Sequence, residues 1–475
     1  MRNFYVFIFA AILLIVFCNL SYSTNIVPAN DPNIQYFGRW DFSVPTAPTH
    51  SWPGVSVYAE FEGTSIGIRM TDNFCYYNVT IDDTIKFVFH PTIFTTASYT
   101  LRSGLPDGHH TIRVTKRNET NWAKFAFNGF VLDDGKNLLM PKQKPAKKIE
   151  FIGDSFTCAS GNEWTSNDSA PPDDSYTNID EGFGAIIARY YDAQFHLTSA
   201  SGFGLIQDWQ GNTNNNLPAI FDRALEYTSL PKWNFGQWIP DLVVICLGLN
   251  DFNSWHGYDS LTIPNQNKTF FHTRYHEFID TIRSLYPGTK ILAVSAHPEW
   301  LKSTISEIVD QENEMGNGDV FYAWFPYYDG GYVNKGHPNV STHHKIADTL
   351  IAVINTIDWG TSQNAIHGRG IFSDDDGTLP GMFALYQNFP NPFNPTTVIR
   401  YQIAGAGSRF YVSLKVYDAL GREIATLIND VEGRGLHQII WDASKFSSGM
   451  YLFRLTSRDQ SGINSTRTMK AILLK

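Results

Sequence analysis

The chain contains 475 residues, of which 43% are hydrophobic, and its formal net charge is -10 at pH 7. This length predicts about three domains, and the hydrophobic content indicates folded domains with sizeable cores rather than a disordered chain. The negative charge argues against nucleic acid as a partner, because nucleic acids are recognised by basic surfaces.

Residues 1–23 have the pattern of a secretory signal peptide. Arg2 supplies the positive start, residues 4–17 form an apolar run too short to span a bilayer comfortably, and residues 21–23 offer a cleavage site. No later apolar run is long enough to cross a membrane. We therefore expect an exported protein, secreted or at the cell surface, without stable membrane insertion.

Three cysteines remain outside this segment, Cys75, Cys158 and Cys246. An odd number cannot pair completely, and two of them lie in apolar segments. Buried free thiols are therefore expected rather than a disulfide framework.

Residues 25–146 form a β-rich region. Short alternating or β-branched runs, separated by Gly, Asp, Asn and Pro turns, occur at residues 55–61, 65–70, 76–81 and 110–116. Such spacing without helical periods predicts a β-sandwich or jelly roll. The sequence GTSIG at residues 63–67 matches the GxSxG motif of a hydrolase nucleophile, but strand follows where that motif needs a helix. A hairpin turn is the expected structure there.

Residues 147–360 change to an α/β pattern. Apolar strands are expected at residues 149–152, 242–247 and 291–295, with helical patterns between them. One helical face carries the apolar side chains of Phe271, Tyr275, Phe278, Ile282 and Leu285. Strands buried on both faces and separated by helices predict a parallel, doubly wound sheet. In such sheets ligands bind at the carboxyl ends of the strands.

The C-terminal part begins with a linker, residues 361–381, which is rich in Gly, Ser and Asp. Residues 382–475 then alternate strand patterns with turn residues and predict a small all-β domain, a β-sandwich. Nothing in this domain pairs a nucleophile with a base.

Ser155 stands where a strand ends. In KKIEFIGDSFT, residues 147–157, an apolar strand is followed by Gly153, Asp154 and Ser155. A small residue permits a sharp turn, and a following helix would aim its N-terminal N–H groups and its positive dipole end at an anion beside the serine. Ser155 is therefore a candidate nucleophile, although Gly-Asp-Ser is also ordinary turn chemistry.

Three further positions complete what acyl transfer requires. Asn250 follows the strand at residues 242–247, Gly202 exposes a backbone N–H in a loop, and His337 precedes a helix late in the region. We predict Ser155 as nucleophile, His337 as general base and then acid, and an oxyanion hole from the Ser155 N–H, the Gly202 N–H and the Asn250 side chain. Singly, each position could be a turn cap, a loop glycine or a surface histidine.

A metal site is not expected. The two adjacent histidine pairs cannot easily share a metal ion, and the sequence contains no HExxH motif. No cofactor is predicted.

A GDS turn, a glycine loop, GLND and a late histidine, in this order, resemble the SGNH hydrolases, which implies a flavodoxin-like sheet. With a β jelly roll directly before KKIEFIGDSFT, and with GLNDF and GHPNVSTHHKIAD, residues 25–359 are similar to carbohydrate esterase family 2. The resemblance carries functional roles over to Ser155, Gly202, Asn250 and His337. It implies a deacetylase of plant polysaccharides such as xylan and glucomannan that uses no metal.

The same resemblance implies that aromatic residues shape a sugar site. Trp209, Trp255 and Trp300 stand near the three motif loops. Core packing is the other interpretation of each.

The C-terminal segment resembles the sorting domain of type IX secretion cargo. The residues that carry this resemblance are NPFNPTT (391–397), VYDALGREI (416–424), GLHQIIWDAS (435–444), GMYLFRL (449–455) and the terminal MKAILLK. It implies the type IX secretion machinery as a partner, with export across an outer membrane. An accessory sugar-binding sandwich is the alternative for this segment.

One position departs from the SGNH pattern. These enzymes commonly carry an aspartate two or three residues before the histidine, and here those residues are Lys335 and Asn334. The family resemblance implies that a main-chain carbonyl can orient the ring instead, which predicts a Ser-His dyad. The alternatives are a glycan-binding protein with a degenerate hydrolase domain and a lipase or esterase acting on other esters.

Overall fold

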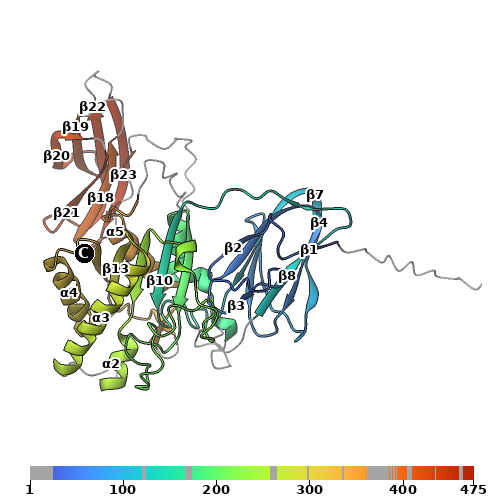
Figure 1. The fold of residues 1–475 in the computed structure, drawn as a ribbon. Helices are drawn as coiled ribbons and strands as arrows, with labels where there is room; N and C mark the ends of the chain where they lie inside the picture. The colour runs from blue at the N-terminus through green and yellow to red at the C-terminus, as the bar shows by residue number, and fades with distance from the viewer. Residues whose placement is uncertain are drawn as a thin grey trace, which may run out of the picture. The chain divides into compact units, whose positions relative to one another are not determined.

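The computed structural model describes residues 25–119, 125–165, 174–256, 265–296, 299–333 and 336–360, and in the C-terminal part 384–385, 388, 391, 393–403, 409–433, 435–458 and 464–474. The predicted signal peptide and the linker at residues 361–381 lie outside these ranges. The chain divides into two compact units at residue 368 (Figure 1).

The first unit begins with a nine-stranded sheet. Its main path runs β1-β8-β4-β7-β5-β6, with β2 and β9 paired to β4 and β3 paired to β8. The strands are β1 (Asn25–Pro28), β2 (Gln35–Phe37), β3 (Thr49–His50), β4 (Ser56–Thr71), β5 (Tyr77–Ile81), β6 (Ile85–Phe89), β7 (Ala97–Lys116), β8 (Phe125–Leu132) and β9 (Leu138–Leu139). Alternate residues of β5 are buried, as period-two patterning requires. The predicted β-rich domain is confirmed.

The hairpin turn predicted at residues 63–67 is wrong. Both flanking runs belong to one continuous strand, β4, whose pairing with β7 shifts register between Gly63 and Ser65. At this irregularity β4 leaves only Thr64 unpaired while β7 leaves residues 104–107 unpaired, so strand β4 continues. The GxSxG match therefore lies within a continuous strand and is not a nucleophile turn.

The second part of this unit is a parallel five-stranded sheet in the order β11-β10-β12-β13-β14. Its elements are β10 (Lys147–Gly153), α1 (Phe183–Tyr190), β11 (Ala193–Ser199), β12 (Leu242–Cys246), α2 (Leu249–His256), α3 (Asn265–Leu285), β13 (Lys290–Ser295), α4 (Glu299–Glu314), β14 (Val320–Trp324), β15 (Tyr332–Val333), β16 (His337–Pro338) and α5 (Val340–Ile354). Because β11 and β12 lie on opposite sides of β10, the chain changes direction at β10, and such a point is where open sheets bind ligands.

The three strands predicted in this region are confirmed as β10, β12 and β13. The predicted apolar face of α3 is confirmed too, since Phe271, Tyr275, Phe278 and Ile282 are buried. Local apolar patterning was sufficient here because each of these elements is buried along its whole length or along one face.

The two parts of the first unit share one hydrophobic core. A single cluster of buried side chains extends from Val27 in the β-rich part to Trp359 after α5. Arg39, which is 1% exposed, crosses from the β-rich part to form a 2.7 Å ion pair with Glu150 of β10 and also donates to the carbonyl of Phe221. A buried ion pair of this kind needs both partners, because removing one leaves an uncompensated charge.

The second unit is a small β-sandwich, as predicted. Its two sheets have the orders β17-β18-β21 and β20-β19-β22-β23. The strands are β17 (Ala384–Leu385), β18 (Thr396–Ile403), β19 (Arg409–Asp418), β20 (Glu423–Gly433), β21 (Gly435–Asp442), β22 (Gly449–Arg458) and β23 (Asn464–Leu473). The sheets share one buried cluster that includes Trp441, which contacts the rings of Phe393 and Phe453.

Two further expectations concern single features. Cys75, Cys158 and Cys246 are buried thiols that form no disulfide bond, as predicted. Among the helices that the structure describes, none combines the length and apolar character needed to span a bilayer.

Candidate active site

The turn that carries Ser155 follows β10 directly. A Cβ atom at Gly153 would lie 1.9 Å from Oγ1 of Thr157 and 3.0 Å from the carbonyl oxygen of Cys246, so no larger residue fits there. The Cys158 N–H then donates to the Asp154 carbonyl at 2.9 Å. Ser155 itself is half-buried.

The helix predicted after Ser155 is wrong. Turns continue to residue 163, and Ala159 has a φ of 54°, which no right-handed helix contains. A helix dipole therefore does not act on this serine. The local sequence still makes the sharp exit from the strand.

Asp154 is buried beneath this turn. One of its carboxyl oxygens accepts the Phe156 N–H at 3.0 Å. Burial raises the pKa of Asp154 to about 7, and the nearby carboxyls of Asp251 and Glu119 act in the same direction.

Gly202 lies in the loop after β11 with a φ of 80°. A Cβ atom there would lie 2.8 Å from Cδ1 of Trp209, so both the backbone and the neighbouring ring require glycine. Within the described part of the chain, neither the Gly202 N–H nor the Ser155 N–H donates a hydrogen bond. Both groups therefore remain open to a substrate oxygen.

Asn250, at the start of α2, ties the loops together. Its Nδ2 donates to the Phe203 carbonyl at 3.0 Å and to Oδ2 of Asp154 at 3.3 Å. The amide therefore lies between the Ser155 turn and the Gly202 loop, where the prediction places an oxyanion donor. Donating to a substrate oxygen requires it to release one of these bonds, and the contact with Asp154 is the longer one.

Asp251 is a residue whose role the sequence did not indicate, because the GLND pattern predicts a role for Asn250 alone. It is fully buried, and its carboxylate accepts the N–H groups of Leu205 at 2.8 Å and Ile206 at 2.7 Å. A Cβ atom at Gly204 would lie 2.3 Å from this carboxylate. Asp251 thus fixes the loop that follows Gly202.

His337 lies on the short hairpin formed by β15 and β16, where it pairs with Val333. Its ring centroid is 6.0 Å from that of Phe156, edge to face, which brings the half-buried histidine beside the residue that follows Ser155. The structure therefore gathers all four predicted positions at the carboxyl edge of the sheet. The catalytic role of each remains a prediction.

The candidates to orient the His337 ring are a main-chain carbonyl and an acidic side chain. Lys335 and Asn334 lie outside the described residues, so orientation of His337 by a main-chain carbonyl stays a prediction. Asp329, the nearest acid upstream of His337 in the sequence, is exposed. His343 is buried, and burial together with the nearby His337 lowers its pKa to about 3, which keeps it neutral.

Glu119 is a second residue that sequence reasoning missed, because it comes from the β-rich part. Its carboxylate accepts hydrogen bonds from both the N–H and the hydroxyl of Ser201, next to Gly202, and from the Ser160 hydroxyl at 3.3 Å. Burial raises the pKa of Glu119. Among the described residues, no three His, Cys, Asp or Glu side chains are placed to hold a metal ion together.

The three aromatic candidates differ in their surroundings. Trp209 is 53% exposed beside Gly202. Trp300 packs edge to face on Phe252 with 4.5 Å between ring centroids. The side chain of Trp255 lies outside the description.

Three family models match the chain. Residues 36–141 match the carbohydrate esterase 2 N-terminal domain, residues 151–377 the GDSL-like lipase/acylhydrolase family, and residues 387–467 the secretion system C-terminal sorting domain.

Individual proteins resemble the first two segments. The cellulase/esterase CelE of Acetivibrio thermocellus is 34% identical over 346 residues, which are 70% of this chain but only 40% of that relative. An acetylxylan esterase / glucomannan deacetylase of Cellvibrio japonicus is 26% identical over 354 residues, 72% of this chain and 94% of the relative.

A solved structure gives the same result. The family two carbohydrate esterase from Clostridium thermocellum in complex with cellohexaose aligns with a TM-score of 0.62 and 32% identity, over 69% of this chain and all of that chain. With the β-rich domain, the parallel sheet and the loops at its edge in place, this chain belongs to carbohydrate esterase family 2.

Proposed function

We propose that the chain is a secreted carbohydrate O-deacetylase that hydrolyses acetyl esters on plant polysaccharides such as xylan and glucomannan. The observation that carries this proposal is the convergence of Ser155, Gly202, Asn250 and His337 at the carboxyl edge of one parallel sheet. The named functions of the relatives from Acetivibrio thermocellus and Cellvibrio japonicus support the ester chemistry and the substrate class.

In the proposed first step, the Ser155 hydroxyl attacks the acetyl carbonyl carbon while His337 accepts the hydroxyl proton. The carbonyl oxygen becomes an oxyanion, which accepts hydrogen bonds from the Ser155 and Gly202 N–H groups and from the Asn250 amide. The bond to the sugar oxygen then breaks, and His337 donates its proton to that oxygen. The sugar leaves with a free hydroxyl, and Ser155 carries the acetyl group.

The second step repeats this sequence, with water as the nucleophile and the Ser155 oxygen as the leaving group. Water attacks the acetyl-serine while His337 accepts a water proton, and the same three donors stabilise the second oxyanion. Collapse releases acetate and returns the proton from His337 to Ser155. No step needs a metal or a cofactor, because the nucleophile and the base are both side chains.

Trp209 gives this site a candidate sugar contact. Its ring is 53% exposed and touches the position of Gly202, so a sugar ring stacked on it would lie beside the oxyanion hole. Trp209→Ala should therefore raise KM for acetylated xylan several-fold and leave kcat/KM for 4-nitrophenyl acetate nearly unchanged. An equal change for both substrates would assign Trp209 to loop packing.

The decisive assay measures acetate released from acetylated xylan and glucomannan by the full chain and by Ser155→Ala. Equal activity in the two proteins would overturn the proposal. A comparison of 4-nitrophenyl acetate with the octanoate ester separates a deacetylase from a lipase, because a lipase prefers the long chain. Polysaccharide binding without turnover, unchanged in Ser155→Ala, would support the glycan-binding alternative.

The C-terminal unit supports a proposed route to the exterior. Its match to a secretion sorting domain, together with the N-terminal signal pattern, suits export by the type IX secretion machinery. Deleting residues 382–475 in a host with this machinery should retain the protein inside the cell envelope. Unchanged export of the shortened chain would contradict this route.

A further inference from the structure

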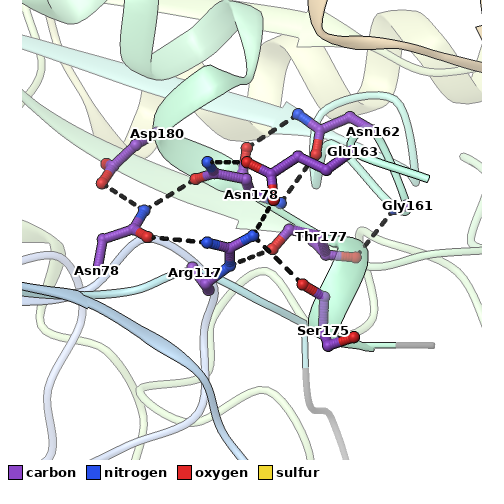
Figure 2. Close-up of polar contacts among 9 residues, drawn as sticks. All are labelled: Asn78, Arg117, Gly161, Asn162, Glu163, Ser175, Thr177, Asn178 and Asp180. Carbon is purple, nitrogen blue, oxygen red and sulfur yellow. Dashed lines mark hydrogen bonds and ion pairs between the residues drawn. The ribbon is translucent and has the colours of Figure 1, made fainter. Parts of the chain in front are cut away.

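The segment that follows β7 leaves the β-rich sheet and enters the α/β part. Figure 2 shows Arg117 of this segment reaching a group of polar side chains between residues 161 and 180. Arg117 is 3% exposed, and Glu119 lies two residues further on. Both side chains contact loops that carry, or directly support, the candidate active site.

Arg117 joins the two parts through several directed bonds. Its Nε donates to the Thr177 carbonyl at 2.8 Å, and its guanidinium forms an ion pair with Glu163. A second link runs in parallel, since Asn78 of β5 donates to Oδ1 of Asn178 at 2.8 Å (Figure 2). A planar guanidinium held on several sides fixes the orientation of its partners as well as their position.

These partners lead to the two catalytic candidates. The Asn178 N–H donates to Oδ1 of Asn162 at 2.9 Å, and Nδ2 of Asn162 donates to the Asn178 carbonyl at 3.0 Å. The Asn162 carbonyl in turn accepts the Val340 N–H at 3.2 Å. Asn162 belongs to the turns that follow Ser155, and Val340 is three residues after His337, so this chain of bonds spans both.

Glu119 acts on the loop that carries Gly202. Its carboxylate holds both the N–H and the hydroxyl of Ser201, and the Ser201 hydroxyl is also 2.7 Å from that of Ser160. Ser201 directly precedes Gly202, so these bonds fix the residue from which the Gly202 N–H, the candidate oxyanion donor, extends.

We propose that residues 117–119 of the β-rich domain are a positioning element of the esterase site, with Arg117 orienting the His337 hairpin and Glu119 orienting the Gly202 N–H. The inference rests on the proposed roles of His337 and Gly202. It makes the β-rich domain a working part of the catalytic apparatus rather than a separable accessory module. Catalytic geometry is sensitive to such support, because a misplacement of about 1 Å can cost about 10²-fold in rate.

The effects of these residues on catalysis must be separated from their effects on the stability of the junction between the two parts. Arg39 provides the matched control, because it is a buried arginine that also crosses between the two parts. Its partners are Glu150 and the carbonyls of Phe221 and Arg223, which belong to none of the loops that carry the four candidate residues. A variant at Arg39 therefore loosens the junction between the two parts without touching the site.

The experiment compares Glu119→Ala, Glu119→Gln, Arg117→Lys and Arg39→Met in the full chain, with 4-nitrophenyl acetate as substrate. We expect Glu119→Ala to lower kcat about 10- to 100-fold with little change in KM. Glu119→Gln, which keeps an acceptor oxygen for the Ser201 N–H, should recover most of this loss. Arg39→Met should lower Tm and leave kcat nearly unchanged.

The dependence of kcat/KM on pH separates the proposed role of Arg117 from that of Glu119. Because Arg117 acts through the hairpin that carries the base, Arg117→Lys should lower kcat and shift the midpoint of the kcat/KM profile against pH. Glu119→Ala should lower the plateau of that profile and leave the midpoint in place, because it acts on an oxyanion donor that does not titrate.

Several results would overturn the proposal. An unchanged kcat in both Glu119→Ala and Arg117→Lys would do so. The proposal would also fail if kcat falls in proportion to Tm in these variants and in Arg39→Met alike. If Glu119→Ala does not fold, Ser201→Ala removes the hydrogen bond between the Ser201 hydroxyl and Glu119 instead. An unchanged kcat in Ser201→Ala would also contradict the proposal. Full activity in Ser155→Ala would instead refute the assignment of the site itself.

Discussion

The two sides of the candidate site are built differently. On the oxyanion side, the loop around Gly202 is held by the buried carboxylates of Asp251 and Glu119, and Asn250 links it to Asp154. On the base side, His337 lies on a hairpin with two residues in each strand, and the sequence places Asn334 and Lys335 where related enzymes carry an acid. If the proposed dyad holds, the buried carboxylates of this site fix the geometry of the oxyanion donors and do not stabilise the charged base.

The largest expected effect tests the base side. His337→Ala removes the only proposed proton acceptor and should lower kcat on 4-nitrophenyl acetate by several orders of magnitude. Asp329→Asn should lower kcat less than about tenfold, because the dyad needs no carboxylate. Steady-state kinetics measures kcat of both variants, and circular dichroism checks that they are folded.

A loss of about 10³-fold or more in folded Asp329→Asn would reveal a triad and erase the contrast between the two sides. Lys335→Asp tests the same contrast by adding a carboxylate instead of removing one. This variant places a carboxylate where related enzymes have one, so it should be tolerated or should raise the rate.

On the oxyanion side, Asn250→Ala should lower kcat by about 10²- to 10³-fold, the usual cost of losing one preorganised donor. Asn253, which is half-buried one turn further along α2, offers the matched control, and Asn253→Ala should change kcat by less than about twofold. If Asn250→Ala costs less than about threefold, the oxyanion hole lies elsewhere.

Asp251→Asn tests how strongly the loop is held. The amide can accept at one oxygen only, so a buried N–H of Leu205 or Ile206 loses its partner, and the free energy of unfolding should fall by about 1–3 kcal/mol. Urea denaturation measures this, with Asp310→Asn on the exposed face of α4 as the neutral control. Equal stability of the two variants would show that the loop does not depend on this carboxylate.

The smallest effect concerns Asp154 and pH. Its pKa rises from 3.8 to about 7 on folding because of burial. Between these two values the unfolded chain has released a proton that the folded chain still binds, so the free energy of unfolding should fall as pH rises from about 4 to about 7. Asp154→Asn should flatten this slope in urea titrations at several pH values, and an unchanged slope would show that Asp154 is ionised throughout.

The sequence alone was sufficient to predict the parts of the fold that local residue patterns determine. The apolar runs gave β10, β12 and β13, and the residues just beyond these strands gave Ser155 and Asn250, because parallel strands bring their carboxyl ends to one edge. It failed where backbone conformation departs from pattern: Ala159 has a positive φ where a helix was expected after Ser155, and β4 continues through residues 63–67 where a hairpin was expected.

The missed residues share another cause. Arg117 and Glu119 lie outside the α/β region and meet the site only through contacts that span tens of residues, such as the 82 between Glu119 and Ser201. No motif spacing encodes such a pairing. Asp251 was visible beside Asn250, but its role depends on the path of a loop that starts about 50 residues earlier, and that path follows from tertiary packing.

The hydrophobic cluster that runs from Val27 to Trp359 has a consequence for how this protein unfolds and how it can be recombined. Two regions with a common interior cannot melt independently, so calorimetry should record residues 25–360 as one cooperative transition and the C-terminal sandwich, with its separate interior, as another. The segment to transplant between esterases is accordingly the whole of residues 25–360. A cut near residue 146 would expose apolar surface on both fragments.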